Sequence, residues 1–445
     1  MQGQSTPAPE PSRKRRHLRG TALTLALGAV MFTVGAVGLA PTGFTEGGKP
    51  SHSAAAGRGS VAALQERVRA LPKDPAGWAA LGMAYVQQAR ATADPATYDR
   101  ATSALRTSLR LQPSGNHQAE TAMGALAAGR HEFRGALDWA EKATVSNPYS
   151  PSAHGVLADA YIQLGRYQDA YRSVQRMVDL RPDSASYARA SYTWELRGDQ
   201  RRARDLMNRS LSAAGTPGER SFARTHLALL ALENGDPRTA LTHADAGLRE
   251  APRDSALLEV RGRAHAALGD ADQAVRDYTS AIAIAPLPHY LLGLGELQQS
   301  LRRPGHAEAQ YTILRAQEQI RGASGGPADV DAILFEADHG DARKAVTMAA
   351  ETAAARPFVA VHDAYAWALH RAGRDTVALE HAHQALALRT RSALFHFHRG
   401  MIHQSLGHTA QARDDLRQAL AIDAHFHPLH APEARNTLSR IDGTA

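Results

Sequence analysis

The stretch "HGVLADAYIQLGRYQDA", residues 154–170, contains a spacing that recurs along most of the chain. Ala158 lies beside a leucine, Tyr161 follows three residues later, and Gly165 precedes Ala170 by five positions. An alanine equivalent to Ala170 returns at steps of 33 to 38 residues. The equivalent residues are Ala101, Ala136, Ala170, Ala203, Ala240, Ala274, Ala307, Ala345, Ala378 and Ala412. Ten units of nearly constant length predict a repeat architecture that grows along one axis.

Each unit contains the signals of two helices joined by a tight turn. Prolines such as Pro182 stop the second helix, and Ser150 with Pro151 is typical of the start of the next one. Small residues at fixed places let two helices approach to about 8–10 Å. A glycine in the turn suits the left-handed conformation that ends a helix. These turn glycines are Gly165, Gly198, Gly235, Gly269, Gly340, Gly373 and Gly407. No segment alternates with the period of a strand.

This pattern resembles the tetratricopeptide repeat family over about residues 71–424. The residues that carry the resemblance are Trp78, Leu81, Gly82 and Tyr85 in the first unit and Gly262, Gly269, Ala274, Tyr278 and Pro286 in the sixth. The resemblance implies an all-α, right-handed superhelical solenoid of about ten helix hairpins. Within the family, the chain is similar to membrane-anchored proteins of GC-rich Gram-positive bacteria.

The N-terminus predicts a membrane anchor. Residues 1–20 form a basic tail, residues 21–40 are apolar and uncharged, and residues 41–60 are a linker rich in Gly, Ser, Pro and Ala. Twenty residues of helix reach roughly 30 Å, the thickness of the hydrocarbon layer. Basic residues on one flank predict a single pass with a cytoplasmic N-terminus and an extracytoplasmic array. The alternative is a cleaved signal and a secreted protein, although Pro41 disfavours the candidate cleavage site.

The remaining boundaries follow from the repeat and its interruptions. Units one to seven occupy residues 61–321, and units eight to ten occupy residues 329–424. Between them, residues 322–328 contain three glycines and a proline, which predicts a hinge loop. Residues 425–445 are expected to form a capping helix at the open end.

Charge and composition exclude several classes of function. The net charge is +7, of which residues 1–20 hold +4, so the remainder carries +3 and is close to balanced. A nucleic-acid partner is therefore not expected, because such proteins carry their excess charge on the folded part. The chain has no cysteine, which excludes disulfides, Cys-ligated zinc and thiol catalysis.

No motif predicts an enzyme or a cofactor. "GASGG" at residues 322–326 places Ser324 in a G-x-S-x-G pattern, but the preceding strand that a nucleophile elbow needs is missing. Eleven of the 22 histidines lie between His362 and His430, none of them in a spacing typical of a metal site. Surface and partly buried histidines are expected here, with weak metal binding or a response to protons as the alternative.

The resemblance implies a concave wall built from the first helix of each unit. The inward positions are then Asp159, Gln163, Tyr192, Arg197, Glu259, Arg263, Trp367, Arg371, Phe397 and Met401. For Trp367 and Phe397 the alternative is packing between repeats. The expected function is a membrane-anchored scaffold that binds a protein or peptide through this surface. The alternatives are a secreted scaffold and an accessory subunit of an envelope enzyme or assembly complex; partner identity and oligomeric state stay open.

Overall fold

The computed structural model describes residues 60–92, 95–323 and 327–443, and these residues form helices with no strand among them. The predicted tail, membrane helix and linker within residues 1–59 lie outside the described residues. Among the residues that are described, no helix is both long enough and apolar enough to cross a bilayer.

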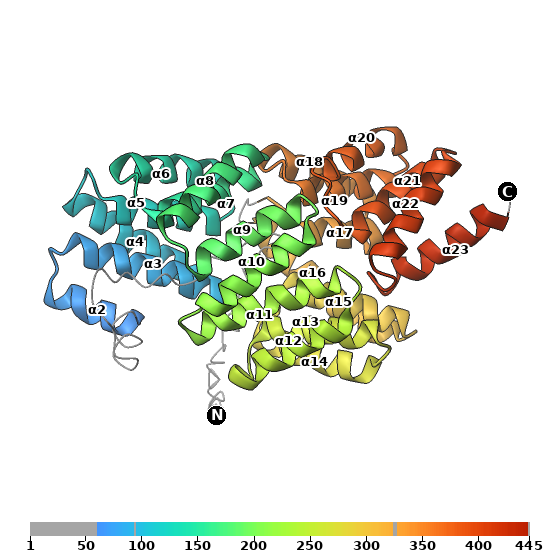
Figure 1. Cartoon of the computed structure of the whole chain (residues 1–445), viewed down its shortest axis with the longest axis horizontal. Coiled ribbons are helices and arrows are strands. Elements are labelled where there is room, and N and C mark those ends of the chain that lie inside the picture. Colours follow the sequence, from blue (N-terminus) through green and yellow to red (C-terminus); the bar gives the residue numbers. More distant parts are fainter. Residues whose placement is uncertain (1–59, 93–94, 324–326, 444–445) are drawn as a thin grey trace, which may run out of the picture.

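The helices pair into ten antiparallel hairpins, numbered here in chain order (Figure 1). Hairpins 1 to 5 are α3 (Pro75–Thr92) with α4 (Pro95–Leu111), α5 (His117–Gly129) with α6 (Phe133–Ser146), α7 (Pro151–Gln163) with α8 (Tyr167–Leu180), α9 (Ser184–Leu196) with α10 (Gln200–Ala213), and α11 (Pro217–Leu232) with α12 (Pro237–Glu250). Hairpins 6 to 10 are α13 (Ser255–Ala267) with α14 (Ala271–Ile284), α15 (Pro288–Ser300) with α16 (Pro304–Ala323), α17 (Val330–His339) with α18 (Ala342–Ala355), α19 (Val359–Arg371) with α20 (Asp375–Ala385), and α21 (Ala393–Ser405) with α22 (Thr409–Ile422).

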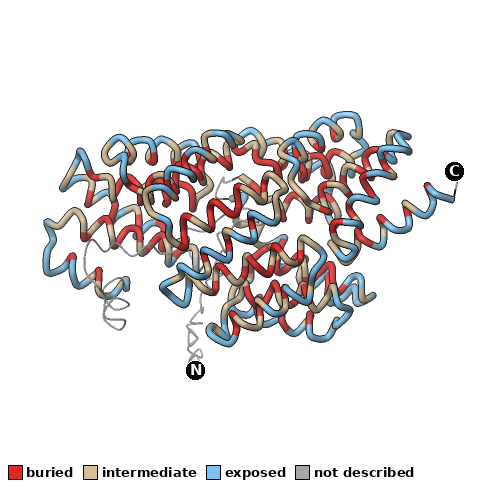
Figure 2. Tube along the Cα trace, viewed as in Figure 1, coloured by how far each residue is buried: buried red, intermediate tan, exposed pale blue. Residues whose placement is uncertain are grey.

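The repeated alanine lies where the two helices of a hairpin cross. All ten equivalents fall in the second helix of their hairpin, with at most 3 % of their surface exposed. A larger side chain would push the helices apart, because protein interiors are packed at crystal-like density. The predicted all-α solenoid of about ten hairpins is therefore confirmed. Figure 2 shows burial following the helix contacts along the whole array.

Most of the predicted turn glycines have the expected left-handed backbone conformation. Six of the seven named glycines take a left-handed conformation, with φ between 70° and 86°. Gly340 does not, and that prediction is wrong: its φ is −138°. The reason is that the Glu336 carboxylate accepts the Asp341 N–H at 3.1 Å and takes over part of the cap. In hairpins 2 and 7, His131 and Arg302 adopt the left-handed conformation instead.

A helix lies at each end of the described array. The first, α2 (Val61–Ala70), packs against α3, and the last, α23 (His430–Gly443), packs against α22. The buried residues of α23 include Ala434, Thr437 and Ile441, which lie on one face at helical spacing. The segment expected to be a hinge begins inside α16, which runs to Ala323, and residues 324–326 lie outside the described residues. Movement there stays a prediction.

The array does not stay open, because hairpins 2–5 lie against hairpins 8–10. Hydrogen bonds cross this contact from Arg134 to the Ala354 carbonyl (3.2 Å) and from the Val359 N–H to the Tyr167 hydroxyl (3.0 Å). The Thr390 hydroxyl donates to the Leu196 carbonyl at 2.8 Å. Figure 1 shows hairpins 2–4 and 8–10 in one row, with α11–α16 below them. The solenoid therefore closes on itself across roughly five repeats.

Apolar packing supplies most of the energy of this closure. One buried cluster combines Ile162, Leu196 and Leu227 with Phe358 and Phe395. Burying one large apolar side chain contributes about 1.5–3 kcal/mol. A hydrogen bond contributes about 1 kcal/mol net. Several such side chains therefore outweigh the hydrogen bonds that cross the same contact.

Candidate functional site

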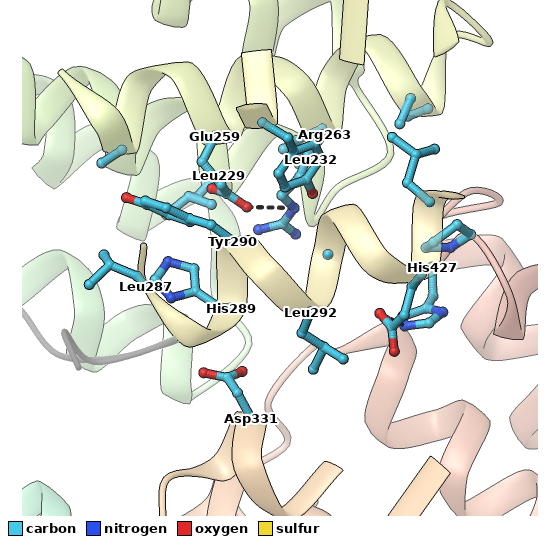
Figure 3. A pocket seen from close by; sticks show the side chains of 18 of the residues that line it. Leu229, Leu232, Glu259, Arg263, Leu287, His289, Tyr290, Leu292, Asp331 and His427 are labelled. Atoms are coloured by element: carbon cyan, nitrogen blue, oxygen red, sulfur yellow. Dashed lines mark ion pairs between the residues drawn. The ribbon is translucent and has the colours of Figure 1, made fainter. Parts of the chain in front are cut away.

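The closed array surrounds a cavity of about 1140 Å³. Its walls are mainly the first helices of hairpins 4–8, namely α9, α11, α13, α15 and α17, with the connection between α22 and α23 along one side. Figure 3 shows Leu229, Leu287, Tyr290 and Leu292 beside polar residues in this wall. Gly218 and Arg253 line the cavity and are also exposed to solvent, so the cavity has an entrance at this end.

The charged part of the lining is predominantly acidic. Eight carboxylates and four arginines line the cavity. Glu259 Oε1 lies 4.0 Å from Arg263 Nε, the ion pair drawn in Figure 3. Glu296 Oε2 lies 2.9 Å from His427 Nε2. Arg263 also lies close enough to Glu233 and Asp423 to act on both electrostatically, so one guanidinium is shared among three carboxylates.

Two carboxylates in the cavity, Glu195 and Glu233, form no ion pair with a described residue. Glu195 follows one turn after Tyr192 on α9, and Glu233 ends α11. In the described part of the chain, no ion pair or side-chain hydrogen bond reaches either carboxylate. Burial raises the pKa of Glu195 well above its usual value, and the neighbouring Glu233 raises it further. Burial likewise raises the pKa of Glu233 to about 7, against the opposing influence of Arg263.

Three other polar side chains line the cavity without a charge at neutral pH. Burial lowers the pKa of His226 to about 4 and that of His289 to about 3, so both imidazoles are neutral. The Tyr192 side chain is 4 % exposed, and its hydroxyl makes no hydrogen bond to any described residue. An unpaired buried hydroxyl costs about 1–3 kcal/mol, which a ligand that hydrogen-bonds to it would recover.

Three of the ten residues predicted from sequence lie together in this cavity: Tyr192, Glu259 and Arg263. Three others lie elsewhere in the packing of hairpins 3 and 4. Asp159 receives a bidentate pair from buried Arg189, at 2.9 and 3.1 Å. Gln163 is buried and accepts from Arg356 at 3.5 Å, inside the contact between hairpins 3 and 8. Arg197 stacks on Trp194, with its guanidinium 3.6 Å from the ring centroid.

The remaining four predicted residues belong to hairpins 9 and 10 and do not line the cavity. Trp367 is 1 % exposed and donates to Asp338 at 3.0 Å, while Phe397 is fully buried. Both are packing residues, and the expectation that they face a groove is corrected by their burial. Arg371 lies 3.4 Å from Asp338. Met401 packs against the apolar cluster that contains Trp367 and Phe397.

The sequence did not single out the carboxylate pair Glu195 and Glu233, nor the histidines of the inner wall. One signal was present in α11, where Gly218, Phe222, Leu229 and Glu233 recur at the spacing of a single helix face. That signal has meaning only once it is known which face of α11 lines a cavity.

The histidine-rich C-terminal part forms hydrogen-bonded pairs. His398 Nδ1 lies 2.9 Å from Asp363, His396 lies 2.8 Å from Asp415, and His362 lies 3.1 Å from His381. Among the described residues, no three or more potential ligands gather into a group that could hold a metal ion. Ser324 lies outside the described residues.

A stack of ten helix hairpins around an inner surface defines an α-solenoid scaffold. Models of the tetratricopeptide repeat match residues 121–185, 226–287 and 393–426. These segments are thus tetratricopeptide repeats, and they lie in hairpins 2–3, 5–6 and 10 of the array.

Several solved structures are similar to this chain. The human IFIT1 dimer with PPP-AAAA has 14 % identity and a TM-score of 0.46, over 81 % of this chain and 85 % of that one. Yeast Tom70 has 13 % identity and a TM-score of 0.35, over 86 % and 92 %. The Pseudomonas aeruginosa pilF structure has 17 % identity and a TM-score of 0.38, over 50 % and 97 %. These are distant resemblances of architecture. No curated protein matches the chain.

Proposed function

We propose that this chain is a membrane-tethered scaffold that binds a segment of a partner protein inside its closed array. The observation that carries the proposal is the cavity of about 1140 Å³, whose walls are the inner helices of consecutive hairpins. It exceeds the usual 300–1,000 Å³ of a small-molecule pocket. Its mixed apolar and charged lining suits a polypeptide segment. Binding through a preformed surface, without turnover, is the proposed mechanism.

The tether rests on residues 1–60 of the sequence. An uncharged stretch at residues 21–40 follows a basic tail, which supports a single-pass anchor with the array outside the cytoplasm. The full-length chain is then expected in the membrane pellet after a carbonate wash. A mature chain that begins near Pro41 and stays in the supernatant would contradict the anchor and support secretion. The similarity to membrane-anchored proteins of GC-rich Gram-positive bacteria stays a prediction from sequence.

Partner capture tests the role of the cavity. Ala267 lines the cavity and is half-buried, so Ala267→Trp places an indole in the space that the partner would occupy. Capture of a partner from gently solubilised membranes, quantified by mass spectrometry, is expected to fall at least tenfold. Ala410→Trp is the matched control, because Ala410 is exposed on α22 and does not line the cavity. Equal capture by the wild type and both variants would overturn the proposal.

A further inference from the structure

The cavity has a local excess of negative charge near hairpins 4–6. Glu195, Glu233, Glu259 and Asp423 line this part of the cavity, and the arginine that acts on Glu233, Glu259 and Asp423 is Arg263. Arg263 is already engaged with Glu259. Arg90 also lines the cavity, but its electrostatic neighbours are Tyr98, Asp159 and Arg189. The pair Glu195 and Glu233 is thus left with mutual repulsion and little compensation.

A second, independent feature lies beside this carboxylate pair. Tyr192 lines the cavity on the same helix as Glu195, one turn earlier, and its buried hydroxyl has no hydrogen-bond partner within residues 60–92, 95–323 and 327–443. Both carboxylates act electrostatically on this hydroxyl, and all three groups line the cavity. A phenol oxygen and two carboxylates offer several acceptors in this part of the cavity. The group that satisfies all three has multiple N–H donors and a positive charge.

The α11 side of the approach to these groups is apolar, while Arg253 lies at the entrance. Phe222, Leu229 and Leu232 line the cavity along α11, between the exposed Gly218 and Glu233. His226 packs against Phe222 with ring centroids 4.2 Å apart, and burial lowers the pKa of His226 to about 4, so the imidazole is neutral. Such a passage suits the alkyl stem of a lysine or arginine, whose charged end then reaches the acceptors.

We propose that Glu195, Glu233 and the Tyr192 hydroxyl form a subsite for one basic side chain, a lysine or an arginine, of the polypeptide that enters the cavity. This inference rests on the proposed function and adds the chemistry of the residue that the partner presents. Transfer of that ammonium or guanidinium from water is compensated by charge-assisted hydrogen bonds to the two carboxylates. A neutral or acidic side chain at the same place leaves the carboxylate pair uncompensated.

The test uses the purified full-length chain and defined probes. Three short serine–glycine peptides carry one central lysine, norleucine or glutamate, and spermidine serves as a free amine. Titration calorimetry is expected to show that the lysine peptide binds at least tenfold more tightly than either of the other peptides and spermidine. Equal affinity of the three peptides, or no binding of the lysine peptide, overturns the subsite. Spermidine binding as tightly as the lysine peptide overturns the assignment to a polypeptide side chain.

Paired isosteric variants locate the binding. In Glu195→Gln with Glu233→Gln, affinity for the lysine peptide is expected to fall at least tenfold while that for the norleucine peptide stays unchanged. The variant is expected to melt no lower than the wild type, because glutamine matches glutamate in shape and carries no charge whose burial opposes folding. Asp205→Asn with Asp272→Asn is the matched control, since both residues are exposed on outer helices. Unchanged lysine-peptide affinity in the glutamine variant overturns the subsite.

Failure of this inference is distinguishable from failure of the proposed function. If Ala267→Trp abolishes partner capture while the glutamine variant captures normally, the cavity binds its partner without this subsite. If the wild type captures no partner, the proposed function fails, and the peptide titrations still decide whether the subsite selects a basic side chain.

Discussion

At the residue scale, a turn glycine can be required for two reasons: a left-handed backbone conformation, or the close approach of another hairpin. The sequence alone does not distinguish them. Gly198 and Gly373 both take a left-handed conformation, with φ of 73° and 72°. A Cβ on Gly198 would lie 2.3 Å from the Arg389 carbonyl oxygen, whereas a Cβ on Gly373 would meet nothing within 4 Å. Gly373 is therefore required by its own turn, and Gly198 also by the approach of hairpin 9.

This difference gives a matched pair of substitutions. Gly373→Ala is expected to cost about 1–2 kcal/mol of unfolding free energy, the strain of a left-handed alanine. Gly198→Ala carries the same strain and in addition a clash with a backbone oxygen that cannot rotate away. We expect its loss to exceed that of Gly373→Ala by at least about 1 kcal/mol, within the usual range for overpacking. Urea unfolding of the two variants measures this, and equal losses would mean that hairpins 4 and 9 do not touch.

At the element scale, the last helix is held in place by ion pairs as well as by its apolar face. His430, at the start of α23, lies 3.4 Å from Asp338 of α17 and 3.4 Å from Glu433. His427, just before α23, pairs with Glu296 of α15. The capping helix is thus attached to hairpins 7 and 8 as well as to hairpin 10, next to which it lies in sequence.

The attachment of α23 is expected to depend on pH. Burial opposes a charge on His430, but Asp338 and Glu433 outweigh it and raise the pKa of His430 to about 9, with Glu296 adding to the effect. A histidine whose pKa is raised in the folded state makes its full contribution to the unfolding free energy at pH values below its pKa in the unfolded chain, about 6.5. That contribution is lost as the pH rises through about 9.

His430→Gln measures this contribution. The unfolding free energy of the wild type is expected to exceed that of the variant at pH 6, and the difference should shrink by on the order of 3 kcal/mol by pH 9.5. His306→Gln, at an exposed position, is the control. A difference between wild type and His430→Gln that stays constant from pH 6 to pH 9.5 would contradict the charged His430.

The hairpins could be predicted from sequence because their constraints are local. Each unit has a buried alanine at its helix crossing, and most units have a glycine in the turn. These residues recur at nearly constant intervals, so every unit independently supports the assignment of a helix hairpin. The closure could not be predicted in this way. Many of the residues that meet there are 191 to 220 positions apart in the sequence. Several of the contacting groups are backbone carbonyls, such as those of Leu196 and Arg389, which any residue could supply.

The same reason explains the mixed outcome for the candidate site. Inward positions inferred from one repeat face a cavity in hairpins 4 and 6, where Tyr192, Glu259 and Arg263 lie. In hairpins 9 and 10 none of the four predicted residues lines the cavity, and two of them, Trp367 and Phe397, are buried. The repeat pattern predicts which face of each helix points inward. The closure determines whether that face lines the cavity or is buried against other hairpins.

At the scale of the whole molecule, the closed array converts an extended concave wall into a partly enclosed cavity. Hairpins 2–5 and 8–10 form the closure, and the first helices of hairpins 4–8 line most of the cavity. Both the proposed partner segment and its basic side chain depend on this arrangement, since an open solenoid would leave Glu195 and Glu233 exposed to water, with ordinary ionisation.

The most direct test of the closure is a cross-link between Arg134→Cys and Ala354→Cys. The Arg134 guanidinium reaches the Ala354 carbonyl at 3.2 Å, and both residues are exposed. The chain has no cysteine of its own, so two introduced thiols report only on each other. A bismaleimide about as long as an arginine side chain should join them as fast as it joins Asp99→Cys with Arg130→Cys, the neighbours of adjacent hairpins. Rapid linking of the control pair with none between positions 134 and 354 would contradict the closed array.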